Sequence, residues 1–282
     1  MSSARLASFR RVLAAALGTS YYRPWLEAAS LHTPQQIAAL GSIEQGLEKL
    51  PSLEPEVFLA HPEEFRNPAA PARRPARFVW PHGRVPRTAV LMEGMGGSRR
   101  VRVFANGLGR KLAWFRPEVL AGPFCKLERL AALLESGALA MRPPSHAVIL
   151  LTRMDQPPLG EAERERLWAA YQVPVYQQIL GFAGELLAWE CEAHQGLHVV
   201  CDAVVLEEQT GRGEERLLAT SLADLVHPVL RLAVGWRARL TEQLCGCGRA
   251  GQRLLLEADG AARARSRAAP GSAQAVSAAV IC

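Results

Sequence analysis

The chain has 282 residues, of which 49% are hydrophobic, so it can bury a substantial core in one large domain or two small ones. Its 33 Lys and Arg residues against 27 Asp and Glu residues give a formal net charge of +6, which suits an anionic partner but equally suits a solvated surface. No stretch approaches the roughly 20 apolar residues that span a bilayer, and six cysteines in a chain of this length do not make a disulfide framework, so we expect a cytoplasmic protein that binds no membrane.

Residues 4–65 read as helices broken by turns. Thr33 before Pro34 predicts a helix start, because threonine caps the first turn and proline tolerates its first position. Residues 67–87 hold five prolines and predict an extended connector. The opening stretch predicts an amphipathic helix packed on a domain rather than a signal peptide, because its apolar residues recur at helical spacing: Leu6, Phe9, Val12, Leu13 and Leu17.

The middle of the chain alternates strand and helix patterns. Short buried strands are predicted at 88–92, 101–104, 146–152 and 173–176, and helices at 125–140 and 160–171. A strand, a helix and a strand within some 30 residues form the unit of a parallel sheet.

The pattern changes to hairpin-like strands after residue 199. Strands are predicted at 203–207, 215–220 and 229–234, with a glycine-containing turn at 210–213. The end of the chain is mostly Ala, Arg, Ser, Gly and Pro, which is typical of disorder. We therefore divide the chain into a helical segment (1–66), the connector (67–87), an α/β core with a β-rich part (88–259) and a disordered tail (260–282).

Three segments resemble the phenylacetate-CoA ligase branch of adenylate-forming enzymes. They are 21–65, with its Tyr-Tyr-Arg and Lys-Leu-Pro phrases, then 147–176, with a Pro-Leu-Gly-Glu turn, and the Cys/His-bearing stretches 189–198 and 245–249. The resemblance covers roughly half of the chain. It implies an α/β fold: a reduced N-terminal domain of that family, with a helical N-terminus, a partly parallel sheet and a C-terminal β-rich part.

The sequence departs from this family at positions that the family's catalysis requires. The glycine-rich stretch 93–100 lacks the family's Ser/Thr-rich phosphate loop. The family's magnesium-binding Glu would fall near Phe182, with Glu185 as the nearest substitute. Arg231 keeps its place, but Trp236 replaces the Asp that binds the ribose of AMP, and indole has only a donor.

These departures predict a degenerate enzyme. The family's C-terminal lysine-bearing domain has no room before the chain ends. We therefore expect full ligase activity to be lost and assign no catalytic residue. Glu185 and Arg231 remain candidate contacts for a cofactor, ATP or AMP with magnesium, whose binding the departures put in doubt.

Cysteines and a histidine predict a metal site. Cys191, His198, Cys245 and Cys247 would complete a tetrahedral Cys3His zinc site, because glycines beside the two later cysteines let both sulfurs face one ion. Zinc in the same motif of some relatives is implied by the resemblance, and a closed site of four protein ligands would be structural. His194 is a rival for His198. The alternative is that these four residues are unrelated, and that Cys245 and Cys247 are free thiols or form a strained disulfide.

Two functions compete on this reading. The first is a zinc-stabilised scaffold or partner protein in an acyl-activating pathway. The alternative is an acyl-activating ligase that retains some nucleotide or acyl-ligand binding. A nucleic-acid partner is not expected, because only the net charge supports it.

Overall fold

The computed structural model describes residues 3–71, 75–211 and 214–257. The N-terminal part is helical, as predicted. Thr33 caps its helix in a capping box with Gln36, and Pro34 occupies the first turn. The helices are α1 (Ser3–Leu17), α2 (Tyr22–Ala28), α3 (Pro34–Ala38), α4 (Ile43–Leu47) and α5 (Pro55–Ala60), followed by a 3-10 turn at Pro62–Phe65.

After the N-terminal helices, strands are interspersed with helices as far as α8, and the described elements that follow α8 are all strands. They are β1 (Ala76–Arg77), β2 (Thr88–Val90), β3 (Met95–Gly96), β4 (Val101–Val103), α6 (Arg110–Phe115), β5 (Val119–Gly122), α7 (Phe124–Glu135), β6 (Ala147–Arg153), α8 (Glu161–Tyr171) and β7 (Val175–Leu180). Then follow β8 (Leu186–Glu190), β9 (Leu197–Val199), β10 (Val204–Gly211), β11 (Glu214–Ser221), β12 (Leu232–Ala233), β13 (Ala238–Thr241) and β14 (Arg253–Leu256).

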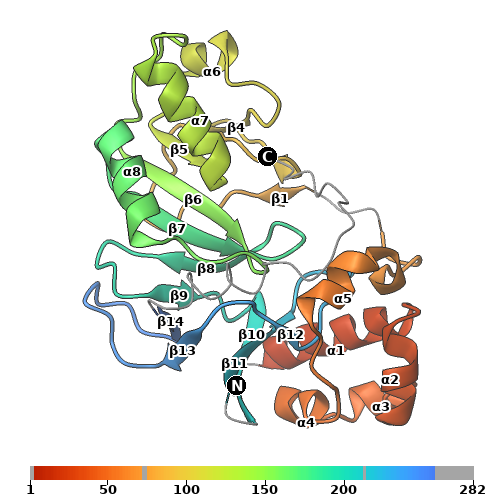
Figure 1. The fold of residues 1–282 in the computed structure, drawn as a ribbon. Coiled ribbons are helices and arrows are strands. Elements are labelled where there is room, and N and C mark those ends of the chain that lie inside the picture. Colours follow the sequence, from red (N-terminus) through yellow and green to blue (C-terminus); the bar gives the residue numbers. More distant parts are fainter. Residues whose placement is uncertain (1–2, 72–74, 212–213, 258–282) are drawn as a thin grey trace, which may run out of the picture.

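Within the described residues, a nine-stranded sheet runs β13-β14-β9-β8-β7-β6-β5-β2-β4. Its strands β4, β2, β5, β6 and β7 are parallel, and β8, β9, β14 and β13 continue it in antiparallel order. Helices α7 and α8 cover one face of the parallel half, as Figure 1 shows. The predicted mixed fold, with a partly parallel sheet and a β-rich part after it, is confirmed.

The sequence of β6 explains why it is an interior strand of this sheet. Its apolar run is continuous because both faces are covered. Val148 and Leu150 join the cluster under α7 and α8, while Ala147, Ile149 and Leu151 join the cluster on the opposite face. Successive side chains of a strand point to opposite faces, so one run supplies two cores.

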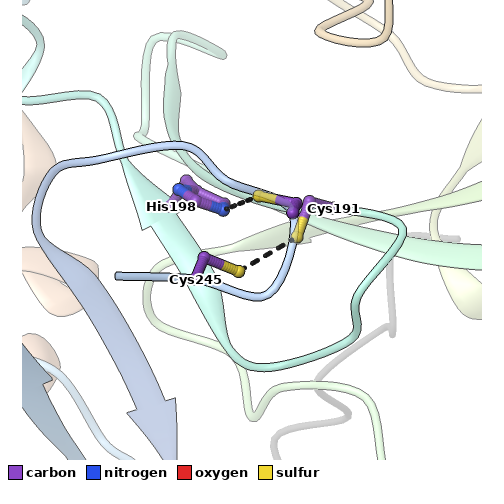
Figure 2. A group of neighbouring side chains, drawn as sticks. Cys191, His198 and Cys245 are labelled. Atoms are coloured by element: carbon purple, nitrogen blue, oxygen red, sulfur yellow. Dashed lines mark hydrogen bonds between the residues drawn. The ribbon is translucent and has the colours of Figure 1, made fainter. Parts of the chain in front are cut away.

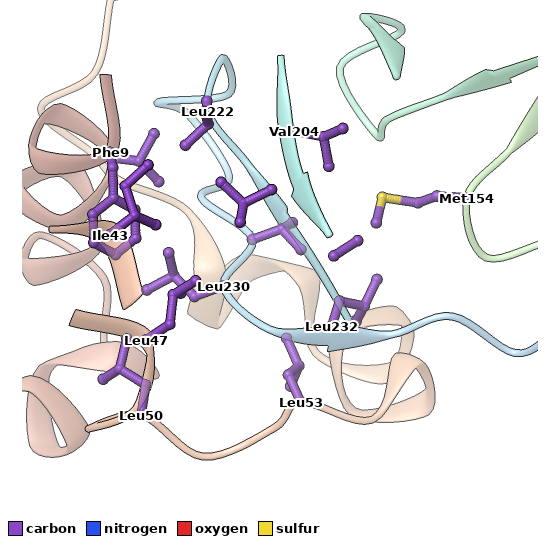
Figure 3. Close-up of a cluster of buried hydrophobic side chains, with 14 of the residues drawn as sticks. Phe9, Ile43, Leu47, Leu50, Leu53, Met154, Val204, Leu222, Leu230 and Leu232 are labelled. Carbon is purple, nitrogen blue, oxygen red and sulfur yellow. The ribbon is translucent and has the colours of Figure 1, made fainter. Parts of the chain in front are cut away.

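A second, three-stranded sheet, β10-β11-β12, lies between the N-terminal helices and the large sheet (Figure 1). Its apolar residues share one core with those helices. Figure 3 shows this core: Phe9, Ile43 and Leu47 from the helical part face Leu222 and Leu230, and Val204 and Met154 lie at its other side. The N-terminal helices are therefore anchored by the β-rich part of the chain.

Several predicted bounds differ from the structure. The strand expected at 229–234 is only two residues long, β12, and the strand expected at 173–176 is β7, which begins at Val175. The connector contains β1, which pairs with β3. The helix expected at 125–140 ends at Glu135, just before Gly137, whose φ of 69° favours a helix C-terminus. The predicted tail 260–282 lies outside the described residues, and the division into domains stays a prediction. None of the described helices has the length and apolar content to cross a membrane.

Candidate metal centre

The four predicted metal ligands converge. Ligand atoms of Cys191, His198, Cys245 and Cys247 all lie within 4.8 Å of one another. The sulfurs of Cys191 and Cys245 are 3.6 Å apart, and the Cys247 sulfur lies 3.4 Å from His198 Nε2. Figure 2 shows Cys191, His198 and Cys245 pointing toward one another.

These spacings fit a tetrahedral ion. Zinc–sulfur bonds of about 2.3 Å and zinc–nitrogen bonds of about 2.0–2.1 Å give tetrahedron edges of about 3.8 Å between two sulfurs and about 3.6 Å between sulfur and nitrogen. The two observed separations are within a few tenths of an ångström of these edges. A Cys3His cluster in this arrangement could hold a metal ion.

Three separate pieces of chain supply the ligands. Cys191 directly follows β8, His198 lies in β9 opposite Trp189, and Cys245 and Cys247 lie in the loop between β13 and β14. Because β14 pairs with β9, the sheet itself brings this loop beside His198.

Glycines shape the loop. Gly248 has a φ of 79° and donates its N–H to the Cys245 carbonyl at 2.8 Å, which closes the turn around Cys247. The Gly246 N–H donates to Gln195 Oε1 at 2.9 Å, and a β-carbon on Gly246 would lie 2.9 Å from the same oxygen. Glycine at 246 thus lets the loop close on the segment that carries Cys191 and His198.

The thiols differ in acidity. Burial, followed by the neighbouring thiol of Cys245, raises the pKa of Cys191 to about 12. Burial also acts to raise the pKa of Cys247, but hydrogen bonds from the backbone and side chain of Arg249 outweigh it and lower the value to about 7. Burial, then the charges of Arg253 and Arg249, lower the pKa of His198. Cys binds metal as the thiolate and His as the neutral imidazole, so the lowered pKa values of Cys247 and His198 favour these states, whereas the raised pKa of Cys191 disfavours its thiolate.

His198, and not its rival His194, belongs to the cluster. The His194 ring bonds to a carboxylate oxygen of Glu190 through Nδ1 at 2.9 Å and stacks on Tyr176 at 5.2 Å. The His198 ring instead stacks on Trp189 at 4.9 Å, which fixes its orientation toward the thiols. Cys201, another cysteine of this part of the chain, does not belong to the cluster.

Open α/β sheets bind ligands beyond the carboxyl ends of their parallel strands, and here aromatic side chains occupy that region. Just beyond β6, the Met154 carbonyl accepts a hydrogen bond at 3.1 Å from the indole of Trp236, which is only 4% exposed. Just beyond β7, the Phe182 ring contacts that of Phe58 at 4.4 Å, and the Arg153 guanidinium lies 5.5 Å from it.

The glycine-rich stretch 93–100 also has internal partners. Its Met95 and Gly96 pair with β1, and the Ser98 N–H donates to the Val101 carbonyl at 2.7 Å. Phosphate cradles use backbone N–H groups that point at the ligand, so this stretch offers fewer of them than its composition suggests.

The structure does not bring the two predicted cofactor contacts together. Glu185 accepts a hydrogen bond from the Ser221 hydroxyl at 2.8 Å, and its carboxylate can fold back because residue 181 is glycine. The backbone N–H of Arg231 donates to Thr220 Oγ1 at 2.9 Å. Since Thr220 and Ser221 are successive residues of β11, they point to opposite faces of the small sheet.

Arg231 is held by the protein itself. Its guanidinium donates to the Leu50 carbonyl, and its Nε lies 3.3 Å from a Glu207 carboxylate oxygen. It therefore ties the N-terminal helices to the small sheet. A role of Arg231 or Glu185 in cofactor binding stays a prediction.

The fold has known counterparts. No family model matches the chain, and no curated protein matches it either. The chain is similar to solved structures of 2-hydroxyisobutyryl-CoA ligase: an open conformation with 2-HIB-AMP and CoA (TM-score 0.62, 18% identity, 89% of this chain and 67% of that chain) and a postadenylation state with R3-HIB-AMP (TM-score 0.61, 16%, 89% and 66%). A third is the thioesterification state with 2-HIB-AMP and CoA (TM-score 0.59, 17%, 90% and 66%).

The chain thus spans about two thirds of the length of these ligase structures. At 16–18% identity, the likeness establishes the fold and does not single out the phenylacetate-CoA ligase branch. The chain has the fold of an adenylate-forming CoA ligase.

Proposed function

We propose that this protein is a non-catalytic relative of phenylacetate-CoA ligases, stabilised by a structural zinc ion, that acts as a scaffold or partner protein in an acyl-activating pathway. The observation that carries the proposal is the hydrogen bond from Trp236 to Met154, which holds the indole in the core. The resemblance aligns Trp236 with the Asp that binds the ribose of AMP in that family. A tryptophan N–H can donate but cannot accept the two ribose hydroxyls.

The metal cluster supports a structural role. Its four ligands leave no position for water, which a catalytic zinc needs. It also joins the β13–β14 loop to β8 and β9, so an ion there would stabilise the antiparallel half of the sheet. We place the protein in the cytoplasm because six cysteines in a chain of 282 residues do not make the disulfide framework of a small secreted domain.

A charged lobe supports the partner role. Residues 84–118 contain eight basic and two acidic residues, so this one segment carries a net charge equal to that of the whole chain. It includes β4 and α6, and Trp114 on α6 is 81% exposed. Trp and Arg are the residues that dominate binding energy at protein interfaces, and a basic surface attracts an acidic one. The lobe offers one exposed aromatic ring rather than the row of rings that single-stranded nucleic acid uses, so an acidic protein surface fits it better.

Ligand binding separates this proposal from its alternative, an acyl-activating ligase with residual nucleotide binding. We expect millimolar ATP with magnesium, or AMP, to leave the melting temperature of the purified protein unchanged. A nucleotide at 100 times its Kd would stabilise the native state by about 2.7 kcal/mol and raise the melting temperature by several degrees. Such a rise would overturn the non-catalytic reading and favour the alternative.

A further inference from the structure

A cavity of about 680 Å³ lies beside α8, between this helix, the start of β7 and the loop that follows β8. It lies at the amino ends of the parallel strands, opposite the carboxyl ends where nucleotides bind in this fold. Its volume is in the range of small-molecule sites, about 300–1,000 Å³. Neither the metal cluster nor the region beyond the carboxyl ends of the parallel strands accounts for it.

The charged groups on the inner wall of the cavity are paired with one another. The buried carboxylate of Glu190 accepts hydrogen bonds from Arg164 at 2.9 and 3.1 Å and from the Gln177 backbone N–H at 3.0 Å. His194 Nδ1 lies 2.9 Å from the same carboxylate, and Arg164 also donates to the Val175 carbonyl at 2.5 Å. The Arg164 charge is therefore compensated by Glu190 and is not available to an anionic ligand.

The outer wall has a different character. Glu161, Glu165 and Trp168 line the cavity from α8, and their i, i+4, i+7 spacing puts them on one face of the helix. Among the residues that the structure describes, neither carboxylate has a hydrogen-bond or ion-pair partner, and Trp168 is 55% exposed. Two uncompensated carboxylates beside an exposed indole face make a negative, partly apolar site on a basic protein.

We infer that this cavity binds an organic cation: an alkylammonium or guanidinium group on an apolar stem. The indole attracts a cation through its ring quadrupole, and the two carboxylates supply the opposite charge. The wall formed by Val173 and Pro174 accommodates the stem. Either a free small amine or the side chain of an Arg-containing peptide has this chemistry.

Isothermal titration of the full, metal-loaded chain with agmatine tests the inference. We expect binding of agmatine that 1-butanol, a neutral molecule with a stem of the same length, does not show, and that weakens as salt rises. A second arm uses a blocked Gly-Arg-Gly tripeptide: tighter binding of the tripeptide than of agmatine would identify the natural ligand as a peptide side chain, and the reverse order as a free amine.

Variants locate the site. We expect Trp168→Ala to weaken agmatine binding about 3- to 30-fold, the range of a cation–π contact, and Glu161→Gln with Glu165→Gln to weaken it further. Trp25→Ala, which removes an indole that is 45% exposed on α2, is the matched control and should bind as the wild type does. All of these side chains are exposed, so the variants should fold, and circular dichroism checks this.

No agmatine binding at millimolar concentration would overturn the inference, as would equal binding of butanol or unchanged affinity in the Trp168→Ala variant. The inference does not depend on the proposed non-catalytic role, because a nucleotide-induced melting shift would leave the titration with agmatine as it is.

Discussion

The indole Nε1 of Trp236 donates a hydrogen bond to the carbonyl oxygen of Met154 at 3.1 Å, across 82 residues of chain. Both side chains belong to the core shared by the N-terminal helices and the small sheet, where Figure 3 shows Met154. The Trp236 side chain is therefore part of the packed core. An Asp in place of Trp236 would bury an unpaired charge.

The contact predicts a measurable cost for Trp236→Phe. The substitution leaves the Met154 carbonyl without its donor and removes part of a buried ring system, so we expect a loss of about 1–3 kcal/mol in the free energy of unfolding. Urea unfolding measures it. Trp114→Phe, at an exposed position, should stay within about 0.5 kcal/mol of the wild type. If the two variants proved equally stable, Trp236 would not have the structural role that we assign to it.

The metal cluster predicts which histidine matters. We expect purified protein to contain close to one zinc ion per chain, Cys245→Ser and His198→Ala to lose most of it, and His194→Ala to retain it, because only His198 faces the thiols. Metal analysis by mass spectrometry, after growth in zinc-supplemented medium, gives the stoichiometry.

Stability provides the control for this experiment. A structural zinc adds its binding free energy to folding, so chelation should lower the melting temperature of the wild type and change that of His198→Ala much less. A wild type that is metal-free and equally stable with and without chelator would contradict the zinc proposal.

Local signals were enough for much of the fold and for the metal set. The cap formed by Thr33 and the continuous apolar run of β6 each specify their element within a few residues, because capping and burial on two faces depend on neighbouring positions. The ligand set could be predicted for a similar reason, since the glycines beside Cys245 and Cys247 permit the turn that a shared ion needs.

Contacts between distant segments could not be predicted in this way. The strand expected at 229–234 is interrupted because Arg231 adopts a φ of 50°, outside the extended region, and this conformation accompanies its contacts with Leu50 and Glu207. The bond between Trp236 and Met154 likewise depends on how β6 and the β12–β13 connection meet, which no local pattern reports.

Arg231 is predicted to stabilise the junction between the helices and the small sheet. Burial raises the pKa of Glu207, and Arg231 acts to lower it, so removing the guanidinium leaves a half-buried carboxylate without its counter-charge. We expect Arg231→Ala to cost about 2–4 kcal/mol in the free energy of unfolding. Arg231→Lys should recover only part of this, because lysine cannot bond to the Leu50 carbonyl and the carboxylate in the same forked geometry.

A double-mutant cycle with Glu207→Gln provides the control. If the pair is coupled, Arg231→Ala should cost clearly less in the Glu207→Gln background than in the wild type. An unchanged cost in both backgrounds would show that Arg231 acts through the Leu50 contact alone.

Glu118 predicts a dependence of stability on pH. Its carboxylate accepts the Arg87 backbone N–H at 2.6 Å and lies within 4 Å of the Arg87 and Arg100 guanidinium groups, and this backbone bond is the main contribution that lowers the pKa of Glu118. A carboxyl whose pKa is lower in the folded than in the unfolded chain stabilises the fold above its unfolded pKa, about 4.3, and loses this contribution as pH falls through the folded pKa.

Glu118→Gln keeps the shape and removes the charge, so we expect it to cost about 1 kcal/mol at pH 7 and progressively less as the pH is lowered toward 3. Urea unfolding across this range measures the change, with the exposed Glu128→Gln as the control that should show little effect at any pH. A cost for Glu118→Gln that is the same at pH 7 and pH 3 would mean that the ionised carboxylate is not what stabilises this corner of the sheet.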